Sequence, residues 1–355
     1  MKGVILHGGS GTRLRPLTYT DVKQLLPVAG KPISEYALEN LMEIGIKDIN
    51  IIIGSTGGEV VKKYYGDGSR WGVNISYTYQ EKPLGIAHAI GLTKNFVNGD
   101  KFVVFLGDNY IQDGISELYD SFISQNSDGM LGLVHVSNPS QFGIAEVNNG
   151  KIVRLVEKPK TPASDLAIAG VYFLSGKVFD FIEKLKPSGR GEYEITEAYQ
   201  NMVDSKLNIG YSIISGWFKD TGTVEDFLDC NRLVLDKLHI KKGWKEINKN
   251  ISGRVSIAED AYISEDSRIL GPCFIGSGTR IENSYIGAFT SIGSNCKISN
   301  SEIEDTIIMD GAEINLSSNF RLRSSLIGPN VKIKTGGKTS NPMKVVLGRD
   351  SRLEF

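Results

Sequence analysis

Isoleucine recurs at an interval of six residues in the last third of the chain. Neither an α-helix nor an ordinary β-strand repeats every six residues. Hexapeptide repeats indicate a left-handed parallel β-helix, in which each isoleucine points inward and stacks on those of neighbouring coils. The alternative is an irregular β-sandwich in which the spacing is coincidental. The series comprises Ile257, Ile263, Ile269, Ile275 and Ile281 and, after a slip of one residue, Ile286, Ile292 and Ile298.

The first two thirds of the chain show a different pattern. Short β-branched runs at residues 3–6, 49–53, 75–79 and 102–106 alternate with amphipathic helical patterns at residues 34–44, 59–65 and 86–96. This alternation predicts an α/β fold, a doubly wound and mostly parallel Rossmann-like sheet with helices on both faces. We therefore expect an α/β domain at residues 1–240 and a β-helix domain with a C-terminal tail at residues 250–355, with the boundary in residues 246–252.

Composition narrows the range of partners and locations. The 355 residues carry a formal net charge of -1, so no global field favours nucleic acid or a membrane surface. Cys230, Cys273 and Cys296 form no C-x-x-C pair, which fits a reducing cytoplasm and argues against zinc or disulfides. Because the N-terminus lacks an apolar signal sequence and no segment has ~18 consecutive apolar residues, we expect a cytoplasmic protein.

A glycine-rich loop follows the first predicted strand. It contains Gly8, Gly9 and Gly11, and the cations Arg13 and Lys23 come after it. Glycines let the backbone approach an anion closely and cations neutralise it, so the loop indicates binding of a nucleoside triphosphate. Walker A and dinucleotide patterns both fail, because the first lacks its Lys-Ser or Lys-Thr pair and the second lacks its third glycine. A tight turn without a ligand is the alternative.

Two aspartates follow predicted strands and could reach a metal ion. Asp108 lies in the sequence GDN after residues 102–106, and Asp220 lies in DTG after the apolar run 211–214. Two carboxylates, phosphate oxygens and water would satisfy the octahedral oxygen ligation that Mg²⁺ prefers. Taken alone, each aspartate would more often be a turn or helix-cap residue.

Further polar motifs lie after other predicted strands or, for Arg190, before a predicted helix at residues 194–203. Gln80 offers a donor and an acceptor to the edge of a pyrimidine, and Gly85 leaves room for a flat base. Lys158 and Arg190 could clamp a second phosphate, while Glu157 accepts hydrogen bonds from hydroxyls. A solvated turn and surface charges are the alternative interpretations.

In combination, the sequences LHGGSGTRLRPLT, KQLLPV, GDN, EKP and DTG resemble the sugar-1-phosphate nucleotidyltransferases. The resemblance runs essentially end to end and matches the long form of the family, which has a C-terminal hexapeptide-repeat domain. It implies transfer of a nucleoside monophosphate from dTTP to glucose 1-phosphate with release of pyrophosphate, Mg²⁺ as the cofactor and a homo-oligomer.

The resemblance also implies a role for individual residues. The nucleotide would be bound by Leu6, Gly8, Gly9, Gly11, Thr12, Arg13, Gln80, Pro83 and Gly85. The sugar phosphate would meet Gly143, Glu157, Lys158, Ile168, Tyr172 and Arg190. Asp108 and Asp220 would hold Mg²⁺, and Arg13, Lys23 and Lys158 would be the catalytic residues.

Several alternatives stay open at this point. His7 stands where the family usually has alanine, and it either hydrogen-bonds a phosphate or ribose or, as we prefer, packs. The activity could instead be uridylyl transfer that makes UDP-sugars, or the chain could be a non-catalytic regulatory relative. Hexapeptide β-helices also build acyltransferases that commonly use a histidine base, but His7, His88, His135 and His239 all precede the repeats. We therefore interpret the repeat domain as structural or oligomeric.

Overall fold

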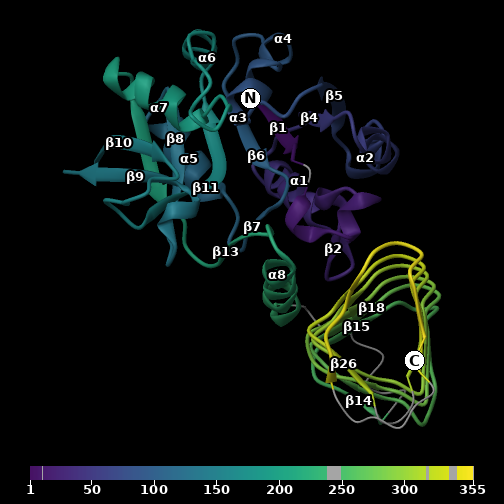
Figure 1. The fold of residues 1–355 in the computed structure, drawn as a ribbon. Helices are drawn as coiled ribbons and strands as arrows, with labels where there is room; N and C mark the ends of the chain where they lie inside the picture. Colours follow the sequence, from purple (N-terminus) through teal and green to yellow (C-terminus); the bar gives the residue numbers. More distant parts are fainter. Residues whose placement is uncertain (10, 238–248, 317–319, 336–341, 355) are drawn as a thin grey trace. The chain divides into compact units, whose positions relative to one another are not determined.

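The computed structural model describes residues 1–9, 11–237, 249–316, 320–335 and 342–354 (Figure 1). Its contacts divide the chain into two compact units, which are described separately here. The first unit comprises Met1–Gly9 and Ser34–Lys219, and the second comprises Ser10–Ile33 and Asp220–Phe355. The domain ranges 1–240 and 250–355 stay a prediction, and residues 246–248 of the predicted boundary lie outside the described residues.

The first unit is built on a mixed sheet that has nine strands within the described residues. Its main order is β10-β9-β11-β6-β1-β4-β5, and β8 pairs with both β11 and β12. The strands are β1 Lys2–His7, β4 Asp48–Gly54, β5 Asn74–Gln80, β6 Phe102–Leu106, β8 Gly129–His135, β9 Gly143–Asn148, β10 Lys151–Glu157, β11 Leu166–Leu174 and β12 Ile209–Ile213, with a short β7 at Asn109–Ile111 outside this sheet. The four predicted strands are confirmed as β1, β4, β5 and β6, which run parallel to one another.

The other half of this sheet is largely antiparallel, which makes the sheet less parallel than expected. β11 runs antiparallel to β6, β8 and β9, and β9 runs antiparallel to β10. The connection from β9 to β10 is Asn149-Gly150, and both residues have positive φ, 49° and 73°. Asn-Gly is the preferred sequence of a two-residue hairpin turn, so this turn is the physical reason for the antiparallel pair.

Helices cover both faces of the sheet. They are α1 Ile33–Glu43, α2 Gly58–Tyr65, α3 Ile86–Gly91, α4 Lys94–Val97, α5 Ser116–Ser124, α6 Val178–Ile182 and α7 Ile195–Asp204. Val4 packs in a core cluster with Ala87 of α3. Because strand side chains alternate between faces, Gly3 faces the other side, where a Cβ would lie 2.9 Å from Leu41 of α1. The doubly wound arrangement is therefore confirmed.

One predicted helix, residues 86–96, is two helices in the structure. α3 ends at Gly91, and α4 begins at Lys94. Between them, the N–H and Oγ1 of Thr93 both donate to the carbonyl of Ile90, at 2.9 and 2.7 Å. A threonine side chain that bonds the nearby backbone competes with the helical pattern, and it marks the break here.

The second unit contains a parallel β-helix of three six-stranded sheets in the described residues. The first sheet contains β14 Ile251–Ser252, β17 Arg268–Leu270, β20 Tyr285–Ile286, β23 Glu302–Glu304, β26 Arg321–Arg323 and β29 Pro342–Met343. The second contains β15 Val255–Ile257, β18 Cys273–Ile275, β21 Thr290–Ile292, β24 Ile307–Ile308, β27 Leu326–Ile327 and β30 Val346–Leu347. The third contains β16 Tyr262–Ile263, β19 Arg280–Glu282, β22 Lys297–Ser299, β25 Glu313–Asn315, β28 Lys332–Lys334 and β31 Arg352–Glu354.

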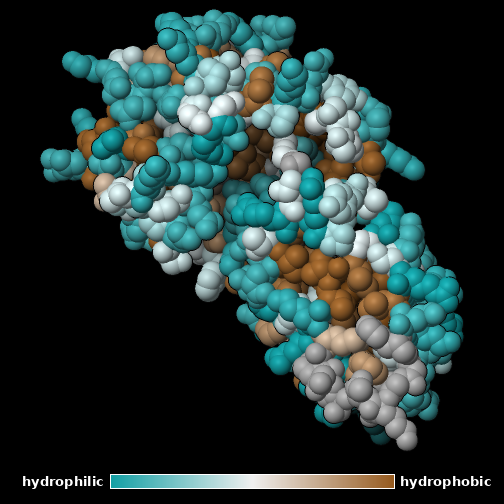
Figure 2. All heavy atoms as spheres, in the orientation of Figure 1, coloured by the Kyte–Doolittle hydropathy of each residue, from teal (hydrophilic) through white to brown (hydrophobic). Residues whose placement is uncertain are grey.

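The isoleucines stack as the repeat predicted. Ile257 pairs with Ile275, which pairs with Ile292 on the next coil. The other two sheets continue the pattern with Ile263, Ile281 and Ile298, and with Ile269 and Ile286. Most of these side chains are buried in one cluster, against which Ile263 packs while partly exposed. Figure 2 shows apolar side chains gathered over the visible face of the β-helix.

The second unit also holds the segment that follows the glycine loop and one long helix. The segment contains the short 3-10 helices Thr12–Leu14, Leu17–Tyr19 and Lys23–Leu25 and the hairpin β2 Pro27–Val28 and β3 Lys31–Pro32. Helix α8, Val224–Asp236, follows β13 Phe218–Asp220 and begins with a capping box between Thr223 and Asp226. None of the helices in the described part of the chain is long and apolar enough to span a bilayer.

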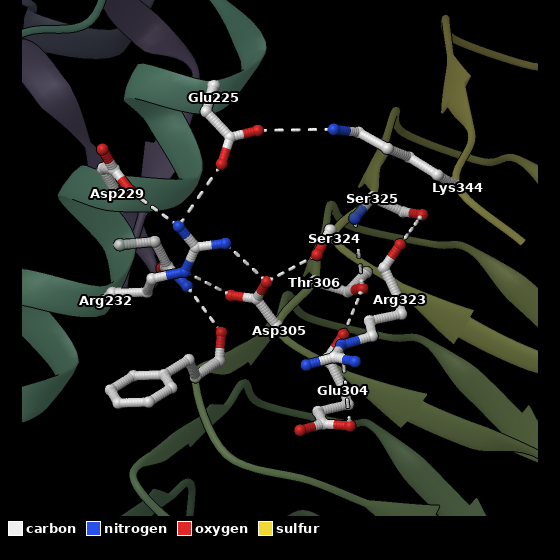
Figure 3. A network of polar contacts seen from close by, with 12 residues as sticks. Glu225, Asp229, Arg232, Glu304, Asp305, Thr306, Arg323, Ser324, Ser325 and Lys344 are labelled. Atoms are coloured by element: carbon white, nitrogen blue, oxygen red, sulfur yellow. Dashed lines mark hydrogen bonds and ion pairs between the residues drawn. The ribbon is translucent and has the colours of Figure 1, made fainter. Parts of the chain in front are cut away.

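Polar contacts join α8 to the β-helix (Figure 3). Arg232 donates to both carboxylate oxygens of Asp305, at 2.7 and 2.6 Å, and to Asp229 at 2.6 Å. The bonds to Asp305 raise the pKa of Arg232 above its ordinary value, despite the opposing effect of burial. Ser324 donates to the same Asp305 at 2.7 Å. The pair is bidentate and partly buried, the geometry in which an ion pair contributes most.

Candidate active site

The glycine loop begins at the carboxyl end of β1. Gly8 and Gly9 are exposed there, and Gly9 has a φ of 102°, which a residue with a Cβ rarely adopts. Asp108 follows β6, the strand next to β1, and the preceding Gly107 donates its N–H to the carbonyl of Leu6 at 3.0 Å. The loop and the GDN sequence therefore occupy adjacent strand ends, as expected for a ligand site in such a sheet.

His7 packs inside the first unit. Its side chain is buried and meets the ring of Tyr65 edge-on, with 5.7 Å between ring centroids. Within the described residues, neither ring nitrogen has a hydrogen-bond partner. Burial lowers the pKa of His7 to about 3, although the charge of Asp108 acts in the opposite direction. A neutral, packed imidazole agrees with the preferred interpretation.

Three of the residues expected to contact the base of the nucleotide lie at the carboxyl end of β5 and just beyond it. Gln80 is 5% exposed, and its amide nitrogen lies 3.3 Å from the carbonyl oxygen of Gly85 and 3.0 Å from Nδ1 of His88. Leu6 belongs to the core of this unit, and Pro83 is exposed. The structure thus brings Gln80 and Gly85 together, and it adds His88, which sequence reasoning did not place here.

Gly85 is a glycine for a structural reason. A Cβ at this position would lie 2.6 Å from the carbonyl oxygen and 2.8 Å from the backbone nitrogen of Tyr193, and φ is 104°. The Tyr193 N–H donates to the carbonyl of Leu84 at 2.8 Å, and its carbonyl accepts from Ala87 at 3.1 Å. The close approach of this backbone, and not only space for a base, therefore requires glycine.

All six residues expected at the sugar phosphate belong to the first unit, and they gather around Glu157. Glu157 ends β10 and pairs with Gly143, the first residue of β9. A Cβ at Gly143 would lie 3.0 Å from the Glu157 carboxylate and 3.3 Å from Ile168 of β11. Burial raises the pKa of Tyr172 well above its usual range, and the nearby charge of Glu157 adds to this effect.

Opposite charges meet at this cluster. Arg190 lies 3.4 Å from Glu157 and 3.4 Å from Glu194, and Lys158 lies 3.8 Å from Glu157. Burial and the charge of Glu194 raise the pKa of Glu157, while the two cations and a hydrogen bond from Thr196 lower it. The arrangement places two cations beside hydrogen-bonding carboxylates, which suits a phosphate attached to a polyhydroxylated group.

The sequence analysis did not identify Glu194 and Thr196 as parts of this cluster. Glu194 is buried at the N-cap of α7, and Thr196 donates to Glu157 at 3.3 Å. The only sequence signal was the excess of acidic residues around Arg190, at Glu192 and Glu194. Lys158 was identified, and its φ of 41° is unusual for a residue with a side chain.

The second unit places the two cations that follow the glycine loop beside the DTG sequence. Lys23 is buried, and its Nζ lies 3.7 Å from Asp220. A Cβ at Gly222 would lie 2.8 Å from the guanidinium of Arg13, so glycine leaves room for this cation. Gly11, with a φ of 57°, begins the 3-10 turn that contains Thr12 and Arg13. Arg13, Lys23 and Asp220 are therefore neighbours, although they are up to about 200 positions apart in sequence.

The predicted metal ligands fall in different units, Asp108 in the first and Asp220 in the second. Among the residues that the structure describes, no group of three or more histidine, cysteine, aspartate or glutamate side chains could hold a metal by itself. Asp220 is about one-third exposed, and its carboxylate is the kind of hard oxygen donor that Mg²⁺ prefers. Joint ligation by the two aspartates stays a prediction.

The segment that follows the glycine loop is anchored to the β-helix within the second unit. Asp21 pairs with Arg349 of the last coil. The ring of Phe274 lies where a Cβ of Gly30 would be, at 2.1 Å, so the hairpin packs directly on the β-helix. The N–H of Ala29 donates at 2.9 Å to Asn231 of α8. The segment from Gly11 to Ile33 is thus fixed to the repeat coils at several points.

Known proteins resemble this chain over much or all of its length. A Streptomyces antibioticus glucose-1-phosphate thymidylyltransferase is 43% identical over 358 residues, covering 100% of this chain and 99% of that protein. The low-salt glycan biosynthesis nucleotidyltransferase Agl11 of Haloferax volcanii is 42% identical over 359 residues, covering 100% of both. A Bacillus anthracis protein solved with sucrose has a TM-score of 0.63 and 40% identity, and the match covers 68% of this chain and 98% of that one. The model of the nucleotidyl transferase family matches residues 2–237, and the chain therefore belongs to that family.

Proposed function

We propose that this protein is a glucose-1-phosphate thymidylyltransferase, which converts dTTP and glucose 1-phosphate into dTDP-glucose and pyrophosphate. The observation that carries the proposal is the 43% identity, over the whole chain, to a relative of that name. The cluster around Glu157 supports it independently, because it combines two cations with hydrogen-bonding groups for a sugar phosphate.

The reaction is a direct displacement. A phosphate monoester has a second pKa of ~6, so the sugar phosphate carries its nucleophilic oxygen already ionised and needs no general base. This oxygen forms a bond to the α-phosphorus of dTTP, and the bond from that phosphorus to the oxygen bridging to the β-phosphate breaks. The electron pair leaves with pyrophosphate. The protein then contributes positioning and charge neutralisation.

In this proposal, each substrate is bound by its own pair of basic side chains. Arg13 and Lys23 bind the phosphates of the nucleotide, and Lys158 and Arg190 bind the phosphate of the sugar. Mg²⁺ is the proposed cofactor, held by Asp108 and Asp220, and it would supply charge stabilisation at the phosphate oxygens. Lys23 lies 3.7 Å from Asp220, which supports the proposal that the cation and the metal ligand serve the same phosphate group.

The β-helix has a supporting role in this proposal. No histidine occurs after position 239, so the repeat coils lack the usual base of hexapeptide acyltransferases. A homo-oligomer and a cytoplasmic location belong to the proposal as well. The three cysteines, which are buried and form no disulfide, agree with a reducing compartment.

Two substitutions test the division of the cations. We expect Arg13→Ala to reduce turnover strongly with little effect on the binding of glucose 1-phosphate, because its proposed partner is the nucleotide. Lys158→Ala should chiefly weaken binding of the sugar phosphate. Pyrophosphate release measures turnover, and calorimetric titration measures binding. The opposite pattern would show that the two phosphate subsites are assigned wrongly.

A further inference from the structure

The orientation of the Gln80 side chain is fixed by its neighbours. Its amide nitrogen lies 3.3 Å from the carbonyl oxygen of Gly85. A carbonyl oxygen only accepts hydrogen bonds, so the nitrogen of the amide and not its oxygen must face Gly85. The opposite orientation would bring two acceptor oxygens together in a site where Gln80 is only 5% exposed.

This orientation also determines the tautomer of His88. Nδ1 of His88 lies 3.0 Å from the same amide nitrogen of Gln80. Because that nitrogen donates, Nδ1 must accept, and the ring proton is then on Nε2. Both amide protons of Gln80 are engaged within the protein, one by Gly85 and one by His88.

The side chain of His88 is itself held in place. His88 lies on the short helix α3, and its ring stacks on Tyr193 with 6.2 Å between centroids and 30° between planes. The backbone of Tyr193 is tied to the same loop and helix through Leu84 and Ala87. The acceptor that faces Gln80 is therefore on a packed ring and not on a mobile surface side chain.

What remains of the Gln80 amide for a ligand is its oxygen. Oε1 lies on the side of the glycine loop, 3.5 Å from the position that a Cβ of Gly8 would take. An oxygen there accepts a hydrogen bond from a ring N–H, which thymine and uracil carry at N3. Cytosine has an acceptor at the same ring position, so it would oppose this oxygen. The sequence analysis expected Gln80 to offer the base both a donor and an acceptor. In the structure, the donor nitrogen already contacts Gly85 and His88.

We propose that His88 is a specificity-determining positioning residue, which holds the Gln80 amide so that only its oxygen faces the base and thereby favours thymine and uracil over cytosine. The inference rests on the proposed function, because it assumes that the base of the nucleotide lies at Gln80. His88 does not touch the reacting atoms in this scheme. It acts through Gln80.

The test is base discrimination by the full-length protein. We would compare kcat/KM for dTTP and dCTP with glucose 1-phosphate in wild-type protein, His88→Phe and His88→Asn. Phenylalanine keeps the stacking ring but removes the acceptor, and asparagine restores an acceptor near the Nδ1 position. His135→Phe is the matched control, because the side chain of His135 is exposed and, among the described residues, bonds only Asp165.

We expect His88→Phe to lower the dTTP/dCTP ratio at least tenfold, His88→Asn to recover most of it, and His135→Phe to leave it unchanged. If His88 had a purely structural role, the substitution would lower kcat/KM equally for dTTP and dCTP and leave their ratio unchanged. A ratio within twofold of wild type in folded His88→Phe, or a wild-type protein that does not prefer dTTP over dCTP, would overturn the proposal. If His88→Phe does not fold, His88→Leu carries the same expectation.

Calorimetric binding of the two nucleotides separates this inference from the proposed function. A wild-type protein that binds dTTP more tightly than dCTP, with a ratio that falls in His88→Phe, supports the role of His88 even if glucose 1-phosphate is not the acceptor. Absence of pyrophosphate release with every sugar phosphate would reject the proposed function alone. Equal binding of dTTP and dCTP would reject the role of His88.

Discussion

Asn231 is the residue whose removal should most directly loosen the attachment of the β2–β3 hairpin to the β-helix. It is fully buried on α8, and its Oδ1 accepts from the N–H of Ala29 at 2.9 Å and from Ser291 at 2.7 Å. Its Nδ2 donates to the carbonyl of Phe289 at 3.0 Å. One amide thus joins the β2–β3 hairpin, the long helix and the β-helix.

The expected cost of Asn231→Ala follows from the groups that it leaves unpaired. The Ser291 hydroxyl can rotate to another acceptor, but the Ala29 N–H and the Phe289 carbonyl cannot. Each of these two buried polar groups costs about 1–3 kcal/mol without a partner, so the local free energy of opening should fall by about 2–6 kcal/mol. This corresponds to amide exchange that is roughly 30- to 20,000-fold faster in the hairpin, since 1.4 kcal/mol is about tenfold.

Hydrogen exchange followed by mass spectrometry on peptides that contain Ala29 measures this change. Asn201→Ala is the matched control, because Asn201 is exposed on α7 and its removal should leave hairpin exchange unchanged. Circular dichroism establishes whether Asn231→Ala is folded. Hairpin exchange less than fivefold faster in a folded Asn231→Ala protein would refute the reasoning, since the three hydrogen bonds would then not hold the hairpin.

Three further predictions concern charge. Burial and Glu194 raise the pKa of Glu157, so the folded chain binds the carboxyl proton more tightly than the unfolded chain. The contribution of this group to stability is therefore lost as pH rises from about 4.5 through the folded pKa. In urea unfolding across this range, the free energy of unfolding should decline less steeply in Glu157→Gln than in the wild type. Asp108→Asn and Asp220→Asn should each abolish Mg²⁺-dependent pyrophosphate release while the protein stays folded, and near-wild-type turnover would exclude that aspartate as a ligand. Asp305→Ala should lower the unfolding free energy by about 2 kcal/mol, because Arg232 loses two charge-assisted bonds; an unchanged Tm would contradict this.

The sequence was most informative where one local pattern decides the structure. The six-residue spacing of isoleucine required a coil in which every sixth side chain points inward, and the pairing of Ile257 with Ile275 confirms it. Short β-branched runs between helical patterns likewise located four parallel strands. In both cases the burial of regularly spaced apolar side chains determines the element, so no long-range information is needed.

The sequence was less informative where distant segments decide the structure. The directions in which strands β8, β9, β10 and β11 run depend on hairpin turns and on strand pairing across the sheet. The sequence Asn149-Gly150 could have revealed the turn between β9 and β10. The assignment of Ser10–Ile33 to the same unit as the β-helix depends on tertiary contacts such as Gly30 with Phe274. No local pattern records such contacts.

The residues of the candidate site also fall into those that the sequence identified and those that only the structure shows. Glu157 and Arg190 were identified from their sequence motifs and Gly143 by resemblance, and the structure brings the three together. Glu194 and His88 were not, because their roles arise from neighbours that are distant along the chain or from the orientation of an amide. A carboxylate next to an arginine and a histidine on a short helix are too common in sequences to indicate a site by themselves.

Nucleotidyl transfer that prefers thymidine triphosphate predicts a characteristic order of substrates. Pyrophosphate release should be measured with purified full-length protein and Mg²⁺ over a matrix of nucleoside triphosphates and sugar 1-phosphates. We predict the highest kcat/KM for dTTP with glucose 1-phosphate, with UTP within about tenfold, which is roughly 1.4 kcal/mol. Comparable kcat/KM for ATP or GTP, or no release with any pair, would contradict the account.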